Sequence, residues 1–302
     1  MQHIPVLRDV SLKYLDPQSG ESVIDCTLGL GGHATSFLER IGKKGKLIGI
    51  DADEMNLSNS VVRVREPALP KKNVELLHAN FRDLPTLDLP PCDVLFADLG
   101  LSSPHIDDPA RGFTFREDGP LDCRFDQSQG LPASHLLQNN SETELIKLFQ
   151  EYAEVQKAHL LVRGIIDARE KSPLQSSSDL VSIVEETYGF KAKRVLPQIF
   201  QALRIAVNDE MEALKILLEH GPLLLKPNGR MGIISYHSLE DRMVKQRFRA
   251  LTQATKDPIT GADLAPASFT LLTKKALQPT LEEVESNPRS RSAKLRIIQK
   301  AS

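Results

Sequence analysis

The amino-acid sequence predicts an α/β protein with a doubly wound sheet and a helical insert. Over the first hundred residues, short apolar segments rich in β-branched residues alternate with helix-length segments, as in parallel βαβ units. Between about residues 106 and 203 no segment has a convincing strand pattern, and helical periodicity dominates. Beyond about residue 208 the alternation returns. We therefore expect a discontinuous α/β domain, 1–105 with 206–302, interrupted by a helical domain, 106–205.

The elements of the first half follow from apolar runs and glycine boundaries. The expected strands are 22–27, 46–51, 73–78 and 92–98, and the expected helices are 34–41 and 54–65. The fourth strand is expected beside the first. Its carboxyl end then lies at the topological switch point, where ligands of such sheets usually bind.

The insert and the second half are assigned in the same way. In the insert we expect a helix over 142–169, a loop over 171–178 and a helix over 179–188 capped by Ser178 or Asp179. A helix over 208–226, a turn over 227–229 and a strand over 230–236 follow, and 267–273 and 293–299 supply the last two strands. Ser238 is expected to cap a helix that runs to Arg249, and Asp241, three residues later, is expected to be the second member of the capping box.

The composition is that of an ordinary globular protein. Of the 302 residues 40% are hydrophobic and 26% are charged, and the net charge is -2, so any nucleic-acid contact must come from local basic patches. We find no signal peptide and no apolar run of about 18 residues, so we expect a cytoplasmic protein without membrane contact. Cys26, Cys92 and Cys123 form no C-x-x-C pattern, which fits a reducing compartment and gives no metal framework.

The segment Gly29-x-Gly31-x-x-Ala34 matches the loose pattern of a nucleotide-binding turn. Glycine lets the backbone turn tightly and approach a ligand, and Asp51 stands 22 positions after Gly29, where an acid commonly accepts ribose hydroxyls. These residues suit the nucleoside of NAD and that of S-adenosylmethionine equally, and a packed turn without a ligand is the third interpretation. Two neighbours favour S-adenosylmethionine. His33 is bulky where a pyrophosphate needs bare amides, and Asp25 suits a cofactor that carries a sulfonium and an ammonium.

Asp98 ends the fourth strand and begins the segment Asp98-Leu99-Gly100-Leu101-Ser102-Ser103-Pro104. An exocyclic amine is a weak nucleophile, because its lone pair is delocalised into the base. Acceptors that hold both N–H groups favour attack and can take the released proton. Asp98 is therefore our catalytic candidate, and a solvated strand end is the alternative. Tyr236 and His237, after the fifth strand, could face the acceptor base.

Three basic clusters could contact a phosphate backbone, although a basic run is usually a solvated face. They are Arg289, Arg291, Lys294, Arg296 and Lys300; Lys191, Lys193, Arg194 and Arg204; and Arg242, Lys245, Arg247 and Arg249.

At these residues the chain resembles the RsmH (MraW) family from His3 to the C-terminus. The matching blocks are 27–33, 98–104, 111–115, 119–126, 200–205, 235–242 and 287–292. The resemblance implies a class I (Rossmann-like) methyltransferase sheet. It also implies methylation of the N4 amine of a cytidine (1402 in the usual rRNA numbering) in the decoding centre of 16S rRNA, on the 30S subunit.

The same resemblance implies S-adenosylmethionine as the cofactor. The implied contacts are Gly31, Gly32, His33, Asp51, Phe81, Asp98 and His105, where the ring of Phe81 would cover the adenine. His33 and His105 lack metal-ligand spacing, and no metal is expected.

The insert departs from the family pattern at Ala153, Val155 and Gln198, which puts the detail of RNA contact in doubt. Two other functions stay open from the residues alone. One is an NAD-dependent oxidoreductase, and the other is a non-catalytic RNA-binding assembly factor that kept the fold.

Overall fold

The computed structural model describes residues 5–64, 73–256 and 263–302. The chain separates into two compact units, Met1–Gly100 with Glu212–Ser302, and Leu101–Met211. The sequence placed the domain boundaries after residues 105 and 205, whereas in the structure they fall after residues 100 and 211. His3, Ile4 and Arg65, which entered the sequence predictions, lie outside the described residues.

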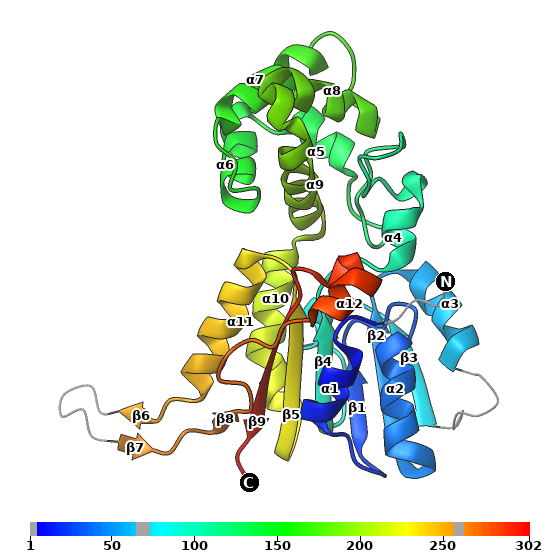
Figure 1. Cartoon of the computed structure of the whole chain (residues 1–302), viewed down its shortest axis with the longest axis vertical. Coiled ribbons are helices and arrows are strands. Elements are labelled where there is room, and N and C mark those ends of the chain that lie inside the picture. Colours follow the sequence, from blue (N-terminus) through cyan, green and yellow to red (C-terminus); the bar gives the residue numbers. More distant parts are fainter. Residues whose placement is uncertain (1–4, 65–72, 257–262) are drawn as a thin grey trace. The chain divides into compact units, whose positions relative to one another are not determined.

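The first unit contains a seven-stranded sheet in the order β3-β2-β1-β4-β5-β9-β8 (Figure 1). Its strands are β1 Ser22–Asp25, β2 Lys46–Asp51, β3 Val74–His78, β4 Cys92–Asp98, β5 Leu225–Ser235, β8 Phe269–Leu271 and β9 Lys294–Lys300. The first five are parallel, and β9 runs antiparallel to both β5 and β8. The doubly wound α/β fold is thus confirmed, and the strand order reverses between β1 and β4.

Alternating side chains of these strands enter two separate cores. Val94 and Phe96 pack with α1 Arg8–Leu15, α2 Gly32–Ile41 and α3 Glu54–Val64, whereas Leu95 and Ala97 pack with α10 Glu210–His220 and α11 Ser238–Leu251. Figure 1 shows α1 and α2 in front of the strands. Because successive side chains of a strand point to opposite faces, both faces are covered, which explains the nearly unbroken apolar runs. The short helix α12 Leu281–Ser286 and the pair β6 Thr255–Lys256 and β7 Asp263–Ala265 complete this unit.

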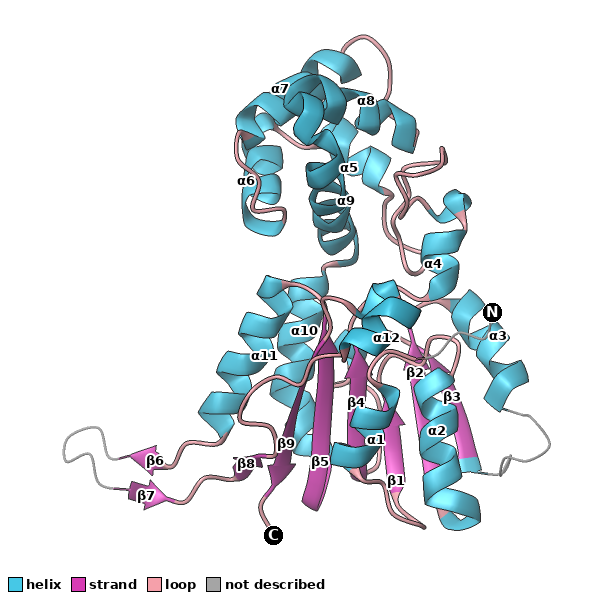
Figure 2. Cartoon of the chain, in the orientation of Figure 1, coloured by secondary structure: helices cyan, strands magenta, loops and turns pink. Residues whose placement is uncertain are grey.

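The second unit consists of helices and loops (Figure 2), and residues 101–211, all of which are described, form no strand. Its helices are α4 Ser103–Asp107, α5 Ala133–Asn139, α6 Glu142–Tyr152, α7 Ala158–Arg169, α8 Ser177–Tyr188 and α9 Ala192–Asn208. They surround a core of their own, in which Phe149 and Leu161 are fully buried.

Several sequence-based boundaries were wrong. The helix predicted over 142–169 is two helices, because Glu154 and Lys157 adopt left-handed φ values of 50° and 63° between α6 and α7. Ala153 and Val155 are nevertheless buried in the core. The apolar spacing therefore continued across a turn, and periodicity could not reveal the break.

The helix predicted over 208–226 was also wrong. Asn208 ends α9, Asp209 is left-handed at φ 50°, and α10 ends at His220. The predicted turn at 227–229 is a bulge inside β5, where the register shifts between Cys92 and Val94 and Asn228 has a φ of 62°.

The helix caps were misplaced as well. Ser176, and neither Ser178 nor Asp179, caps α8, and its side chain accepts from the Asp179 N–H. At α11 the cap position is His237, and Glu240 accepts hydrogen bonds from the backbone N–H groups of Tyr236 and His237. Both errors have one physical cause: several neighbouring polar residues can cap a helix, and packing selects among them.

Candidate functional site

The loop between β1 and α2 takes its shape from glycines. Gly31 has a φ of 77°, a left-handed conformation that residues with a Cβ rarely adopt. A Cβ on Gly32 would come within 2.5 Å of Cγ of Pro5, so glycine is required where the N-terminal segment lies against the helix. The backbone at the start of α2 thus depends on glycine at both positions.

Asp51, at the end of β2, connects this loop to the sheet through hydrogen bonds. Its Oδ2 accepts a hydrogen bond from the Gly29 N–H at 2.6 Å, and its Oδ1 accepts from the Asp53 N–H at 2.8 Å. Asn56 Nδ2 lies 3.3 Å from the same Oδ1. These bonds hold a partly exposed carboxylate beside the loop, at the position where the sequence predicts an acceptor for ribose hydroxyls.

Asp25, the last residue of β1, is fully buried. Its Oδ1 accepts from the Thr27 N–H at 3.2 Å, whereas Oδ2 has no hydrogen-bond partner among the described residues. Burial raises the pKa of Asp25 to about 7, and the nearby His33 opposes this shift. A buried acceptor without a partner costs free energy, so a cationic or hydrogen-donating ligand group would be stabilising here.

Asp98, the last residue of β4, is held by two neighbouring segments. Its backbone N–H donates to Thr27 Oγ1 at 2.6 Å, and the Tyr236 hydroxyl donates to its Oδ1 at 2.8 Å. Its Oδ2 lies 3.7 Å from His33 Nε2, and its side chain is 23% exposed. These contacts therefore fix the orientation of the Asp98 carboxylate, and its side chain remains partly exposed. Sequence reasoning missed Thr27, although its position directly before the glycine loop was the available signal.

Tyr236 follows β5 and packs its ring over the turn after Asp98. A Cβ on Gly100 would come within 3.0 Å of Tyr236 Cε2, so glycine at 100 is what admits the ring. Burial, and then the charge of Asp98, raise the pKa of Tyr236 well above its usual value. The hydroxyl is consequently a neutral donor throughout the physiological range.

The two histidines of this unit that were predicted as site residues, His33 and His237, are largely buried. The ring of His33 lies 4.6 Å from that of Phe96, centroid to centroid, and stacks on Phe37 at 6.2 Å. His237 Nε2 lies 2.9 Å from Glu240 Oε1, in a pair whose side chains are 8% and 3% exposed. Packing accounts for both rings, and their contacts with cofactor or substrate stay predictions.

Two other predicted cofactor residues occupy ordered local structures. Phe81 begins a short 3-10 helix after β3, where Asn80 and Asp83 form a capping box, and its partly buried side chain packs against one of the two cores of the sheet. His105, in the second unit, is buried against Phe113 and Phe125, and Ser102 N–H donates to its Nδ1 at 3.2 Å.

Two arginines of the family-specific blocks in the second unit take part in hydrogen bonds within that unit. Arg111 is buried and donates through Nη2 to the carbonyls of Arg124 and Phe125. Arg204 makes a bidentate pair with Glu210, with distances of 2.7 and 2.9 Å. Arg204 belonged to a basic cluster predicted to contact RNA, but in the structure its guanidinium is paired with Glu210 within its own unit.

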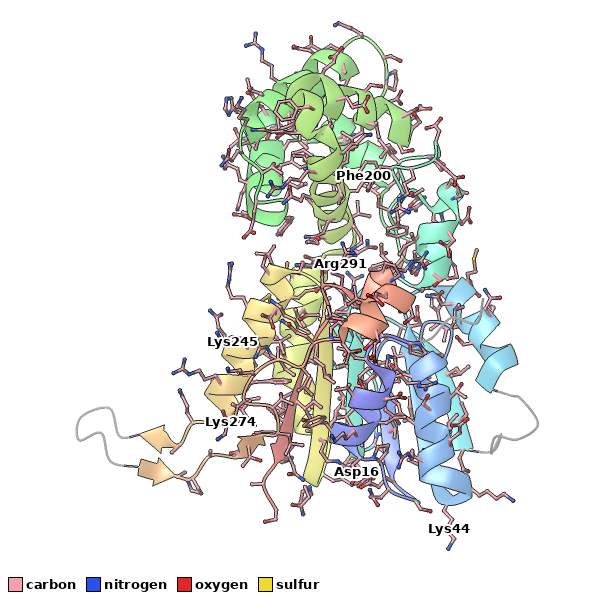
Figure 3. All side chains as sticks on the ribbon, in the orientation of Figure 1. Asp16, Lys44, Phe200, Lys245, Lys274 and Arg291 are labelled. Atoms are coloured by element: carbon pink, nitrogen blue, oxygen red, sulfur yellow. The ribbon has the colours of Figure 1, made fainter. Side chains whose placement is uncertain are left out.

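Among the other residues of the basic clusters, some are paired within the protein and others are exposed. Lys294 and Arg296 bind Asp241, at 3.2 and 2.7 Å, and are not free surface charges. Lys245 is exposed on α11 and extends away from the sheet in Figure 3. Lys191, Lys193 and Arg194 are exposed as well.

The part of the chain that the structure describes contains no helix that is long and apolar enough to cross a membrane. Within the same residues, no group of three His, Cys, Asp or Glu side chains is placed to hold a metal ion.

A glycine loop, an acid at the end of β2 and an oriented carboxylate at the switch point together define an α/β protein built to bind a nucleoside cofactor. The chain belongs to the MraW methylase family, whose model matches residues 1–301.

Curated relatives agree over nearly the whole length. Ribosomal RNA small subunit methyltransferase H of Halothermothrix orenii is 37% identical over 99% of both chains. The protein of the same name from Thermomicrobium roseum is 40% identical over 99% of this chain and 93% of its own. Among solved structures, a putative rRNA-methylase from Clostridium thermocellum is 12% identical, with a TM-score of 0.47 over 99% of this chain and 98% of that chain.

Proposed function

We propose that this protein transfers a methyl group from S-adenosylmethionine to the exocyclic N4 amine of a cytidine in the decoding centre of 16S rRNA. Membership of the MraW methylase family supports the reaction type, and the relatives' name supports small-subunit rRNA as the substrate. The substrate is the rRNA within the 30S subunit, and the site of action is the cytoplasm. An NAD-dependent oxidoreductase has no support from the family.

The residues of the α/β unit fit the cofactor. The unpartnered oxygen of buried Asp25 suits the cationic part of S-adenosylmethionine. Asp51 would accept the ribose hydroxyls, Phe81 would cover the adenine, and the loop at Gly31 and Gly32 would approach the cofactor with bare backbone. The predicted contacts at His33 and His105 remain part of the proposal.

The oriented carboxylate of Asp98 is the observation that carries the proposal. When bound, the cofactor supplies a methyl group on a sulfonium, which makes that carbon electrophilic. Asp98 would accept a hydrogen bond from the N4 amine and take the proton that the amine loses. Tyr236, by donating to Oδ1, turns the other oxygen of Asp98 toward this task. His237 would face the acceptor base.

The deciding experiment is methyl transfer from labelled cofactor to small subunits isolated from a strain that lacks the gene. We expect label on the rRNA, recovered as N4-methylcytidine after digestion. Protein-free 16S rRNA is the matched control substrate, and methylation of it alone would contradict the subunit as substrate. Subunit binding with no transfer would instead identify a non-catalytic assembly factor.

A further inference from the structure

Phe190 is the most exposed large apolar side chain among the described residues. Its relative exposure is 92%, against 59% for Leu131 in the same unit. Single exposed apolar residues are common, but an aromatic ring almost wholly in water forgoes the burial that normally stabilises it. Such a ring is therefore a candidate contact for a partner.

The backbone around Phe190 is anchored on both sides. Gly189, at φ 54°, ends α8, and the hydroxyl of the preceding Tyr188 donates to the carbonyl of Gln156 at 3.0 Å. Ala192 and Leu196, which follow on α9, are buried in the core of this unit. The ring consequently stands on a short 3-10 turn held between two packed helices.

Three exposed cationic residues follow Phe190 within four positions of the chain. Lys191 Nζ lies 5.7 Å from the centroid of Phe190, and Lys193 and Arg194 are exposed one and two residues into α9 after Ala192. The first turn of α9 contains no acid, although acids are favoured at the positive end of a helix. The nearest acids along the chain are Glu185 and Glu186 on the last turn of α8.

We infer that Phe190, Lys191, Lys193 and Arg194 form a contact surface for single-stranded RNA. The ring stacks on an unpaired base, and the three cations hold the flanking phosphates. Stacking on an aromatic ring combined with phosphate contacts is how proteins bind unpaired strands with little sequence preference. This inference rests on the proposed function, because it assigns part of the rRNA substrate to this surface.

The ring is tested by three variants of the full chain, with a fluorescent single-stranded oligocytidylate and undermethylated small subunits as probes. Phe190→Ala should weaken binding of both probes by about 5- to 100-fold, the range expected for one base stacked on one ring. Phe190→Trp should retain binding. Leu131→Ala, which also removes an exposed apolar side chain of this unit, should match the wild type.

The cations are tested by the salt dependence of oligocytidylate binding. Replacing Lys191, Lys193 and Arg194 by Gln should reduce the slope of log affinity against log salt by about 2, since each phosphate contact on a single strand contributes about 0.7. Replacing Lys147 and Lys171, exposed lysines elsewhere in this unit, by Gln should leave the slope unchanged.

The outcomes separate this inference from the proposed function. If the wild type methylates subunits and Phe190→Ala binds and methylates equally well, the surface is not an RNA contact and the function stands. Loss of subunit binding by Phe190→Ala with undiminished oligocytidylate binding would assign the surface to a protein partner and overturn the inference. If the wild type transfers no methyl group, the proposed function fails, while oligocytidylate binding still reports on the surface.

Discussion

The buried arginines of the second unit and the buried Asp25 of the first differ in how fully their charges are paired. In the second unit Arg204 and Glu210 satisfy each other through two short hydrogen bonds, and Arg111 donates to backbone carbonyls. In the first unit Asp25 is buried just as deeply, but one of its oxygens has no partner among the described residues. A paired buried charge costs little as long as both partners are present, whereas an unpaired buried polar group lowers stability and is tolerated where a ligand supplies the missing partner. The buried arginines of the second unit therefore serve the fold, whereas we propose that Asp25 of the first unit serves a ligand.

Substituting the two aspartates near the ends of β4, Asp98 and Asp93, is the sharpest test of this contrast. Asp98→Ala removes the only carboxylate that the proposal assigns to N4, so methyl transfer should fall by about 10²- to 10⁴-fold. The fold should persist, because the side chain is 23% exposed and its backbone bond to Thr27 remains. Initial rates with labelled cofactor, together with circular dichroism, check both statements.

Asp93 at the other end of β4 is the matched control. Its carboxylate binds Lys226 at 2.7 Å and the Ser22 N–H at 2.8 Å, near the amino ends of β4 and β1 and opposite the strand ends that carry Asp98 and Asp25. Asp93→Ala should lower stability by about 1–3 kcal/mol and leave transfer within a few-fold of wild type. Equal loss of transfer in both variants would show that Asp98 acts only through the fold.

In the second unit, breaking the buried pair should unfold the protein more easily. Arg204→Ala leaves the Glu210 carboxylate without its partner and should cost about 3–5 kcal/mol of unfolding free energy. The double variant Arg204→Met, Glu210→Leu should recover most of this loss, because no charge is then left unpaired. Urea denaturation measures both; a single variant as stable as wild type would contradict the structural role.

Asp25→Asn should make the first unit less sensitive to pH. Burial raises the folded-state pKa of Asp25 from 3.8 to about 7, so its contribution to stability is complete below about pH 4 and is lost as the pH rises to about 7. From pH 4 to pH 8 the unfolding free energy of Asp25→Asn, relative to that of the wild type, should therefore increase by about 4 kcal/mol. Thermal unfolding of both proteins at each pH, without cofactor, gives this difference.

The same substitution should weaken cofactor binding at pH 8, because the carboxylate that would face the cationic cofactor is absent. Isothermal titration with S-adenosylmethionine measures the loss. A variant that gains stability at high pH and binds the cofactor undiminished would show that the buried charge has no part in binding.

Tyr236→Phe should have the smallest effect. It removes one hydrogen bond to Asp98 Oδ1, which at about 1–2 kcal/mol corresponds to roughly a ten-fold lower kcat. The KM for the cofactor and the stability should change little, because the ring still packs on Gly100. A loss confined to KM would instead assign Tyr236 to ligand binding.

Much of the α/β unit was predictable from its sequence. The strands that end at Asp51 and Asp98 were placed correctly, and so was the glycine turn before α2. Apolar runs, glycines and terminal acids are local signals, and they sufficed where one element follows another without a break. The two helices on either side of Ala153 and Val155 were merged, because the apolar residues of the intervening turn serve the same core as the helices.

The sequence by itself determined the fold class, the positions of the parallel strands along the chain and the residue types at the switch point, since these depend on periodicity and on neighbours in the chain. Only the tertiary structure decided which charges are compensated. Arg204 and Lys294 both read as free cations, yet they bind Glu210 and Asp241. The sequence singled out Asp25 as suited to a cationic cofactor but did not predict its burial; of the three acids at the strand ends it alone is fully buried with an oxygen unpartnered among the described residues. Desolvation and pairing depend on what surrounds a group in space, and the surroundings of these residues come from segments that the chain brings together only when it folds.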